Sequence, residues 1–236
     1  MKRLPGLFML LFMAAFVLTS SIGSAEGIGV VTQAGINNYA YIYQEVFSEV
    51  IVLQRGRENS AAIEQVGAEH LAGVVQIGEK NDIEVKQLGQ RDLLFSMQFG
   101  YENYANVIQT HPIVATQSPA YISNNDAFTY QTGLYNVLNL LQIGDDNTAS
   151  VYQIDDNNEA FIVQEQMPLS VGTNATLVVQ VGIGNWASRQ QLGAHQAIRT
   201  FQVGNGNTSM IDQRGLDNTA AVFQTGNENT VAINQG

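Results

Sequence analysis

The chain has 236 residues, and its 21 acidic side chains against 10 basic ones give a formal net charge of −11. This balance argues against nucleic acid as a partner, because phosphates need a basic surface. The chain has no cysteine, so packing and hydrogen bonds rather than disulfides must supply its stability.

Residues 1–25 predict a cleaved signal peptide. Lys2 and Arg3 form a basic start, Leu7 to Val17 an apolar run, and Gly23-Ser24-Ala25 a small-residue cleavage site. The alternative is a membrane anchor, but the run is short for a bilayer span of about 20 residues, and no later segment is better suited. We therefore expect export, with no transmembrane segment in the mature chain.

From residue 33 onward a glutamine recurs, mostly at intervals of eleven residues. A glycine usually follows two residues later and an asparagine or other polar residue five residues later. A short fixed period of this kind predicts stacked units that bury their inner faces against each other. The ladder consists of Gln33, Gln44, Gln54, Gln65, Gln76, Gln87, Gln98, Gln109, Gln131, Gln142, Gln153, Gln164, Gln180, Gln191, Gln202, Gln213, Gln224 and Gln235.

The composition favours strands over an eleven-residue helical repeat. Glycine and asparagine in nearly every period would destabilise a helix, glycine by about 1 kcal/mol relative to alanine. Two residues before the glutamine stands mostly Val or Ile, and four before it often Ala, as in Ala61, Ile63 and Gln65. Because side chains alternate along a strand, these positions share one face, which we expect to be buried.

Glycine and asparagine then mark the turns, since both tolerate positive φ angles. Two units make one coil of 22 residues, so the sequence predicts an all-β, two-sheet parallel β-solenoid of about nine coils. The turn positions are Gly56, Asn59, Gly78, Asn81, Gly100, Asn103, Gly144, Asn147, Gly204, Asn207, Gly215, Asn218, Gly226 and Asn229. Following alternate units places Gln98 and Gln142 in one sheet, and Gln109 and Gln131 in the other.

A buried glutamine needs partners for its donors and its acceptor. Identical amides stacked at the strand spacing satisfy one another, as they do in cross-β assemblies. We therefore expect an interior amide ladder; the alternative is that these glutamines are exposed to solvent.

Two interruptions of the eleven-residue glutamine period predict loops. Gln109 and Gln131 are 22 residues apart, with Ala120 at the missing rung, and Gln164 and Gln180 are sixteen apart. Pro112, Pro119 and Pro168, the prolines outside the signal peptide, fall in these gaps, as expected if proline is excluded from hydrogen-bonded strands. We place the insertions near 111–125 and 165–173.

Two further features give specific expectations. Arg189 occupies a position mostly held by Val or Ile, so we expect the strand from Trp186 to Gln191 to be distorted and Arg189 to reach solvent or an acid. The last ladder strand, Val231 to Gln235, is expected to be an uncapped edge that can template another copy.

No enzyme emerges from the sequence. His70, His111 and His195 share no spacing, and no metal or cofactor site is expected. Calcium at the pairs Asp145-Asp146 and Asp155-Asp156 is less favoured than solvated turn acids. A regular outward threonine array, which would indicate an ice-binding solenoid, is absent.

The pattern Gln-x-Gly-x-x-Asn-x-Ala-x-x-x-Gln, as in Gln54 to Gln65 and Gln142 to Gln153, resembles the curlin repeat. The resemblance covers residues 31–236 and implies that residues 26–236 form a curlin-type domain. It also implies a secreted structural subunit of curli-type extracellular amyloid fibres, acting in adhesion and biofilm matrix formation.

Gln-x-Gly on both edges of the coil is closest to the minor, nucleating subunit, with the major subunit as an alternative. The implied partners are the chain itself or a second curlin-type subunit, and a dedicated outer-membrane secretion channel with accessory factors. The remaining alternative is a soluble solenoid adhesin that does not polymerise.

Overall fold

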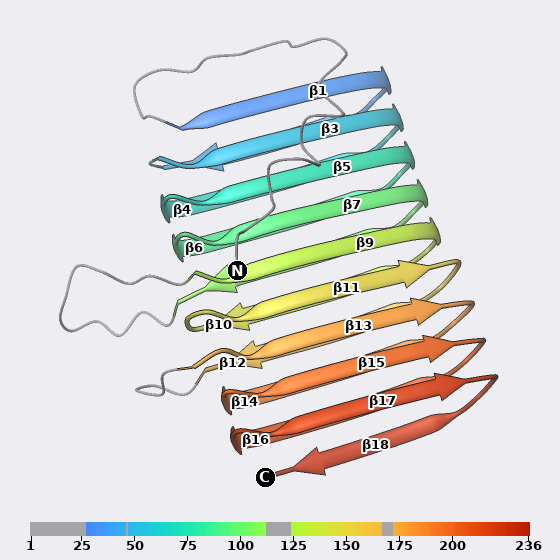
Figure 1. Ribbon diagram of the computed structural model, residues 1–236. Helices are drawn as coiled ribbons and strands as arrows, with labels where there is room; N and C mark the ends of the chain where they lie inside the picture. The colour runs from blue at the N-terminus through green and yellow to red at the C-terminus, as the bar shows by residue number, and fades with distance from the viewer. Residues whose placement is uncertain (1–26, 46, 112–123, 167–171) are drawn as a thin grey trace, which may run out of the picture.

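The computed structural model describes residues 27–45, 47–111, 124–166 and 172–236, so the expected signal peptide and all three prolines of the gaps lie outside the described residues. The described residues form eighteen strands in two nine-stranded parallel sheets (Figure 1). The predicted two-sheet parallel β-solenoid is thereby confirmed. No helix in this part of the chain is long and apolar enough to cross a membrane.

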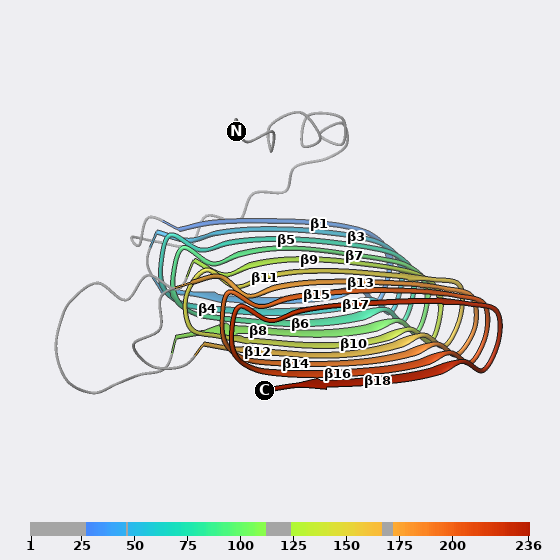
Figure 2. The same ribbon diagram turned by 60° about the horizontal axis from the view of Figure 1, so that its bottom comes forward.

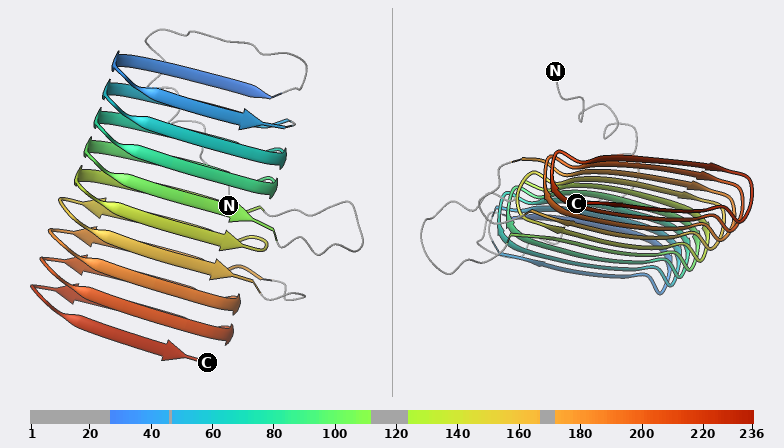
Figure 3. Two further views of the ribbon diagram at one scale, coloured as in Figure 1. Left: turned by 180° about the vertical axis from the view of Figure 1, so that it is seen from behind. Right: turned by 90° about the horizontal axis from the view of Figure 1, so that it is seen from below.

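The two sheets take alternate strands. The odd-strand sheet contains β1 (Ile28–Ile36), β3 (Glu49–Arg57), β5 (Leu71–Glu79), β7 (Leu93–Tyr101), β9 (Asp126–Leu134), β11 (Thr148–Ile154), β13 (Ala175–Val181), β15 (Ala197–Val203) and β17 (Thr219–Thr225). The even-strand sheet contains β2 (Tyr39–Gln44), β4 (Ser60–Ala68), β6 (Asp82–Gln90), β8 (Tyr104–Thr110), β10 (Val137–Ile143), β12 (Glu159–Glu165), β14 (Trp186–Ala194), β16 (Thr208–Leu216) and β18 (Thr230–Gln235). Figures 2 and 3 show the sheets as facing layers of a flattened coil.

Neighbouring strands pair in register, so that Gln54 faces Gln76 and Gly56 faces Gly78. The residues four and two positions before each glutamine point inward together with it. In β4, Ala61, Ile63 and Gln65 are all fully buried. Each coil therefore adds the same layer of small, branched and amide side chains to a continuous core.

The expected assignment of glutamines to sheets is wrong after Gln109. The structure pairs β9 with β7, so Gln131 lies opposite Gln98, and β10 with β8, so Gln142 lies opposite Gln109. Counting eleven-residue units assumes that the interruption occupies a place in the stack. The strands on either side of the interruption instead pair directly with each other.

The expected insertions fall between β8 and β9 and between β12 and β13, and most of their residues lie outside the described ranges. Glu165, expected in the second loop, is the last residue of β12.

The turns differ from expectation in one respect. The glycine two residues after the glutamine does have positive φ, for example 130° at Gly78. The other left-handed residue is the one four positions after the glutamine, such as Glu58 or Lys80, and not the asparagine at the fifth. The asparagine therefore serves a role in the turn other than adopting a positive φ angle.

The expectation for Arg189 is also wrong. β14 pairs regularly with β12 and β16, and Arg189 points inward and is fully buried. The strand needs no distortion because the neighbouring strands supply polar partners. Arg189 also marks the boundary between the two buried apolar clusters, one reaching Ala187 and the other starting at Ile198.

Candidate functional site: the stacked amide ladders

The odd-strand sheet holds a continuous ladder of nine glutamines. Each Nε2 donates to the Oε1 of the glutamine one coil further along the chain, at 2.8 Å from Gln54 to Gln76 and 3.0 Å from Gln76 to Gln98. The remaining steps, from 2.6 to 3.1 Å, join Gln33 to Gln54, Gln98 to Gln131, Gln131 to Gln153, Gln153 to Gln180, Gln180 to Gln202 and Gln202 to Gln224.

The even-strand sheet holds a second ladder with the same direction. Its steps, from 2.7 to 3.5 Å, join Gln44, Gln65, Gln87, Gln109, Gln142, Gln164, Gln191, Gln213 and Gln235 in that order. The structure thus brings the eighteen glutamines together as two columns rather than one site. The longest step, 3.5 Å from Gln191 to Gln213, lies beside Arg189.

The glutamines also join the two sheets. Nε2 of Gln76 donates to the carbonyl oxygen of Ser60 at 2.7 Å and to that of Asn81 at 2.9 Å. Ser60 begins an even strand, whereas Gln76 belongs to an odd one. A single amide therefore satisfies its donors along the ladder and across the interior, which makes its burial tolerable.

A third amide column lies in the turns that lead from an odd strand to the next even strand, the asparagine edge. Nδ2 of Asn81 donates to Oδ1 of Asn59 at 3.0 Å and to the carbonyl oxygen of Gly100 at 3.1 Å. The column contains Asn38, Asn59, Asn81, Asn103, Asn136, Asn158, Asn185, Asn207 and Asn229. From Asn59 onward, each asparagine donates to the Oδ1 of the asparagine in the preceding coil, opposite to the glutamine ladders, and Asn158 does so through its backbone N–H alone.

The glycines of the turns are required by close packing between coils. A Cβ atom on Gly78 would lie 1.9 Å from the carbonyl oxygen of Gly100, the equivalent residue of the next coil. The predicted turn positions 56/59, 78/81, 100/103, 204/207 and 226/229 belong to the asparagine edge. Those at 144/147 and 215/218 lie on the opposite edge.

That opposite edge, the mixed edge, carries varied residues at the equivalent buried position. They include Ser48, His70, Asp92, Asn125, Asn147, Asn174 and Gln196. Among them Asn147 donates to Asn125 at 2.9 Å and Asn125 to Oδ1 of Asp92 at 3.2 Å. Sequence reasoning missed His70, Asp92 and Gln196, as well as Asn38, Asn136, Asn158 and Asn185; a search five residues after each glutamine would have found all seven.

His70 and Asp92 form a buried titratable pair within this column, with Nδ1 3.4 Å from Oδ2 and both side chains inaccessible to solvent. Nε2 of His70 lies 3.2 Å from the carbonyl oxygen of Val66, and the backbone N–H of Asp92 donates to Nδ1 at 3.3 Å. This arrangement suits the neutral imidazole with its proton on Nε2. Burial lowers the pKa of His70, and the charge of Asp92 opposes that effect only in part.

Arg189 is held by hydroxyl and carbonyl groups rather than by an acid. Its guanidinium donates to Oγ1 of Thr200, to Oγ of Ser209 at 2.8 Å and to the carbonyl oxygen of Ser209 at 2.7 Å. Burial lowers the pKa of Arg189 to about 9, because no carboxylate compensates for the lost solvation.

In the described part of the chain, no cluster of three metal-ligating side chains occurs. Asp146 accepts a hydrogen bond from Asn124, and Asp156 accepts one from the backbone of Leu134, each at 2.9 Å. These acids therefore stabilise turns.

Two nine-stranded sheets joined by stacked amide columns define a repeat protein of the parallel β-solenoid class, whose identical layers are its functional feature. The model of the curlin associated repeat matches residues 48–78, 56–89 and 204–236. The matched residues therefore carry repeats of the curlin family, which support a curli-type subunit in general. This family is structural rather than enzymatic, and its members are exported and form extracellular fibres. No curated protein matches the chain significantly.

Proposed function

We propose that this chain is exported to the cell surface and adds end to end to a curli-type fibre, continuing both sheets and the amide columns from copy to copy. The observation that supports this proposal most directly is the opposite direction of the columns. At the C-terminal end of the described stack, Gln224 and Gln235 direct Nε2 groups away from the rod, whereas Asn229 directs an Oδ1 acceptor. At the N-terminal end, Gln33 and Gln44 present Oε1, whereas Nδ2 of Asn38 donates within the rod, to the carbonyl oxygens of Ala34 and Gly56.

These two ends are complementary to each other but not to themselves. A donor meets an acceptor at both glutamine ladders only when β17 and β18 of one copy pair with β1 and β2 of the next. Such head-to-tail contacts repeat without closing and generate a filament. Each added copy gains main-chain and side-chain hydrogen bonds together.

The finer role that we propose is the nucleating subunit, acting in adhesion and biofilm matrix formation. Glycine follows the ladder glutamine on both edges, as at Gly67 and Gly78, so both edges can approach a second curlin-type subunit closely. The major fibre subunit is the alternative. Substoichiometric chain should shorten the lag of a second curlin-repeat protein if it nucleates, and should leave the lag unchanged if it only elongates.

Polymerisation itself is tested with the chain that begins at residue 26. We expect thioflavin-positive fibres and a meridional reflection near 4.7–4.8 Å. A soluble solenoid adhesin, the second candidate, predicts a chain that stays monomeric at high concentration. That result would reject the fibre proposal.

The growing end is tested with Ala232→Pro combined with Asn234→Pro, here called the edge-blocked variant. The first residue of β2, Tyr39, donates its N–H to Asn59 of the next coil, and residues two and four later point the same way. The equivalent N–H groups of Ala232 and Asn234 therefore point away from β16, and proline removes them without breaking the existing sheet. We expect slow assembly, with Ala232→Thr and Asn234→Thr as the control; growth at the parental rate would place elongation elsewhere.

A further inference from the structure

The outer faces of the two sheets differ in charge. Three outward positions on each strand lie three and one residues before the ladder glutamine and one residue after it. In the described strands of the odd sheet, only Arg55 and Arg199 carry a charge at these positions. The even sheet carries Glu45, Glu64, Glu84, Lys86, Glu165, Asp212 and Arg214 there.

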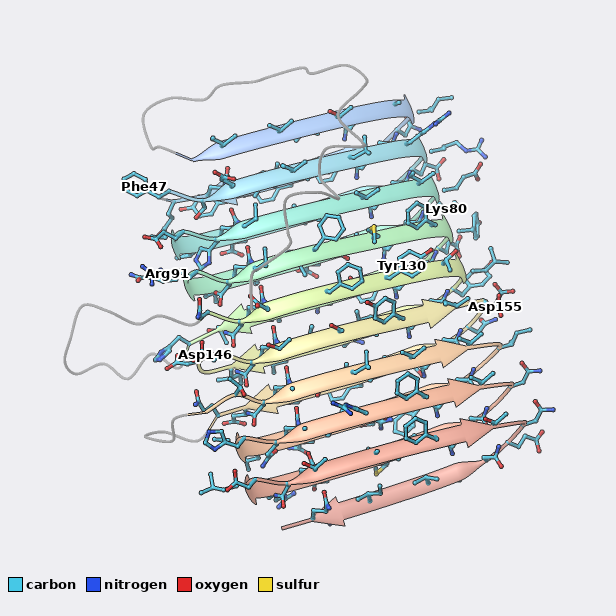
Figure 4. All side chains as sticks on the ribbon, viewed as in Figure 1. Phe47, Lys80, Arg91, Tyr130, Asp146 and Asp155 are labelled. Carbon is cyan, nitrogen blue, oxygen red and sulfur yellow. The ribbon has the colours of Figure 1, made fainter. Side chains whose placement is uncertain are left out.

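The odd face is also rich in aromatic rings that stack along the rod. Ring centroids lie 5.9 Å apart for Phe95 and Phe128, and 5.4 Å apart for Phe128 and Tyr152. Phe201 and Phe223 are nearly parallel at 5.1 Å, and Phe223 is 72% exposed. Figure 4 shows aromatic rings in front of the odd strands, with Tyr130 labelled.

The odd face as a whole, polar side chains included, has the extent of a protein interface. Nine strands about 4.8 Å apart and five residues of about 3.3 Å each give a footprint of roughly 700 Å². A standard interface buries about 800 Å² on each partner, so this one face approaches the area that a stable pair needs.

The shape of the odd-strand face also favours a specific contact with an opposed surface. The large rings of β7 and β9 and those of β15 and β17 flank smaller side chains, including Ser150, Ala175 and Ala197. Together with Leu177 and Arg199, these side chains line a shallow hollow of about 290 Å³. A side chain from an opposed face can enter it, so the surface permits interlocking.

We propose that the odd-strand face is a lateral interface that binds the same face of a second copy of this chain, so that rods associate in pairs. The chain is acidic overall, and this arrangement turns the acidic even-strand faces outward, where they stay far apart. The odd faces meet with aromatic and branched side chains across about 10 Å. The contact lies beside the rod and is independent of the end-to-end addition proposed above.

A matched pair of double variants tests the interface. Tyr130→Lys with Val179→Lys places two charges on the odd face, two coils apart, at the position before the ladder glutamine. Ile108→Lys with Val163→Lys places them identically on the even face. All four side chains are partly buried, so the strain within the rod is comparable.

The measurement is mass per length of the fibres by scanning transmission electron microscopy. For the parent and the even-face variant we expect two chains per axial length of one rod, about 43 Å for nine coils. For the odd-face variant we expect one, a twofold drop, with fibres still growing. One chain per axial length in the parent, or two in the odd-face variant, would overturn the proposal.

A second measurement decides the matter if the odd-face variant forms no fibres. In the edge-blocked background, sedimentation should show dimers for the parental faces and for the even-face variant, and monomers for the odd-face variant. Monomers for all three, or dimers for all three, would overturn the lateral interface. Because sedimentation needs no fibre, a failure of the lateral interface can be distinguished from a failure of the proposed function.

Discussion

Gln142 illustrates how one interior residue is tied to several neighbours. It accepts a hydrogen bond from Gln109 at 3.0 Å and donates to Gln164 at 2.9 Å and to the carbonyl oxygen of Asp126 at 3.2 Å. We predict that Gln142→Leu leaves partners unpaired in the core, at a cost of about 1–3 kcal/mol for each group.

Urea unfolding in the edge-blocked background measures this cost. Gln190→Leu is the matched control, because Gln190 lies on β14 of the same sheet but is exposed. Equal losses in the two variants would mean that the interior ladder contributes no more than a surface amide.

The burial of His70 leads us to predict that the stability of the folded chain depends on pH. Its pKa is lowered by burial, so the unfolded chain binds a proton at a higher pH than the folded chain does. Stability is therefore fully present above the ordinary histidine pKa of about 6.5 and decreases as the pH falls below it. We predict that His70→Asn flattens this dependence in unfolding curves between pH 7 and 5.

The control for that prediction is His195→Asn, on the same edge but with a largely exposed side chain. A parental pH profile in His70→Asn would show that another group causes the acid sensitivity.

The burial of Arg189 leads us to predict that apolar replacements at this site can stabilise the core. The triple change Arg189→Met, Thr200→Val and Ser209→Ala replaces a buried cation and its hydroxyl partners with apolar groups. We expect stability to stay equal or to rise by about 1–4 kcal/mol in calorimetry. Thr200→Val alone should lower it, because the guanidinium loses its Oγ1 partner; a stabilising single change would contradict this account.

At the scale of the strand and its turn, the close spacing between coils determines which residues a turn can accept. We predict that Gly78→Ala destabilises the rod strongly, because the added methyl group would overlap the backbone of Gly100. Gly206→Asn, in a turn where the nearest atom would lie 3.6 Å from a new Cβ, should be tolerated. Both glycines have positive φ, so melting temperatures that fall equally would assign the effect to backbone conformation alone.

At the scale of the whole molecule, each coil contacts only its neighbours, so stability should decline toward both ends. In the edge-blocked variant we predict the fastest amide exchange in β1, β2, β17 and β18. Fibres of the parental chain should protect all four, because head-to-tail contacts cover both ends. Protection at one end alone would contradict a continuous filament.

The sequence by itself determined the strand period, the buried face and the ladder residues. These follow from local geometry, since alternation along a strand places Ala61, Ile63 and Gln65 on one side whatever the rest of the chain does. In-register stacking followed as well, because only equal spacing gives each amide an identical neighbour.

Tertiary structure decided what depends on partners distant in sequence. It paired Gln98 with Gln131 across an insertion, and it placed Thr200 and Ser209, eleven and twenty residues away, around Arg189. It also gave the turn asparagines a hydrogen-bonding role that their backbone preference did not indicate. The physical reason is common to all three: a buried polar group is stable only with a partner, and the fold rather than the local sequence determines which partner is within reach.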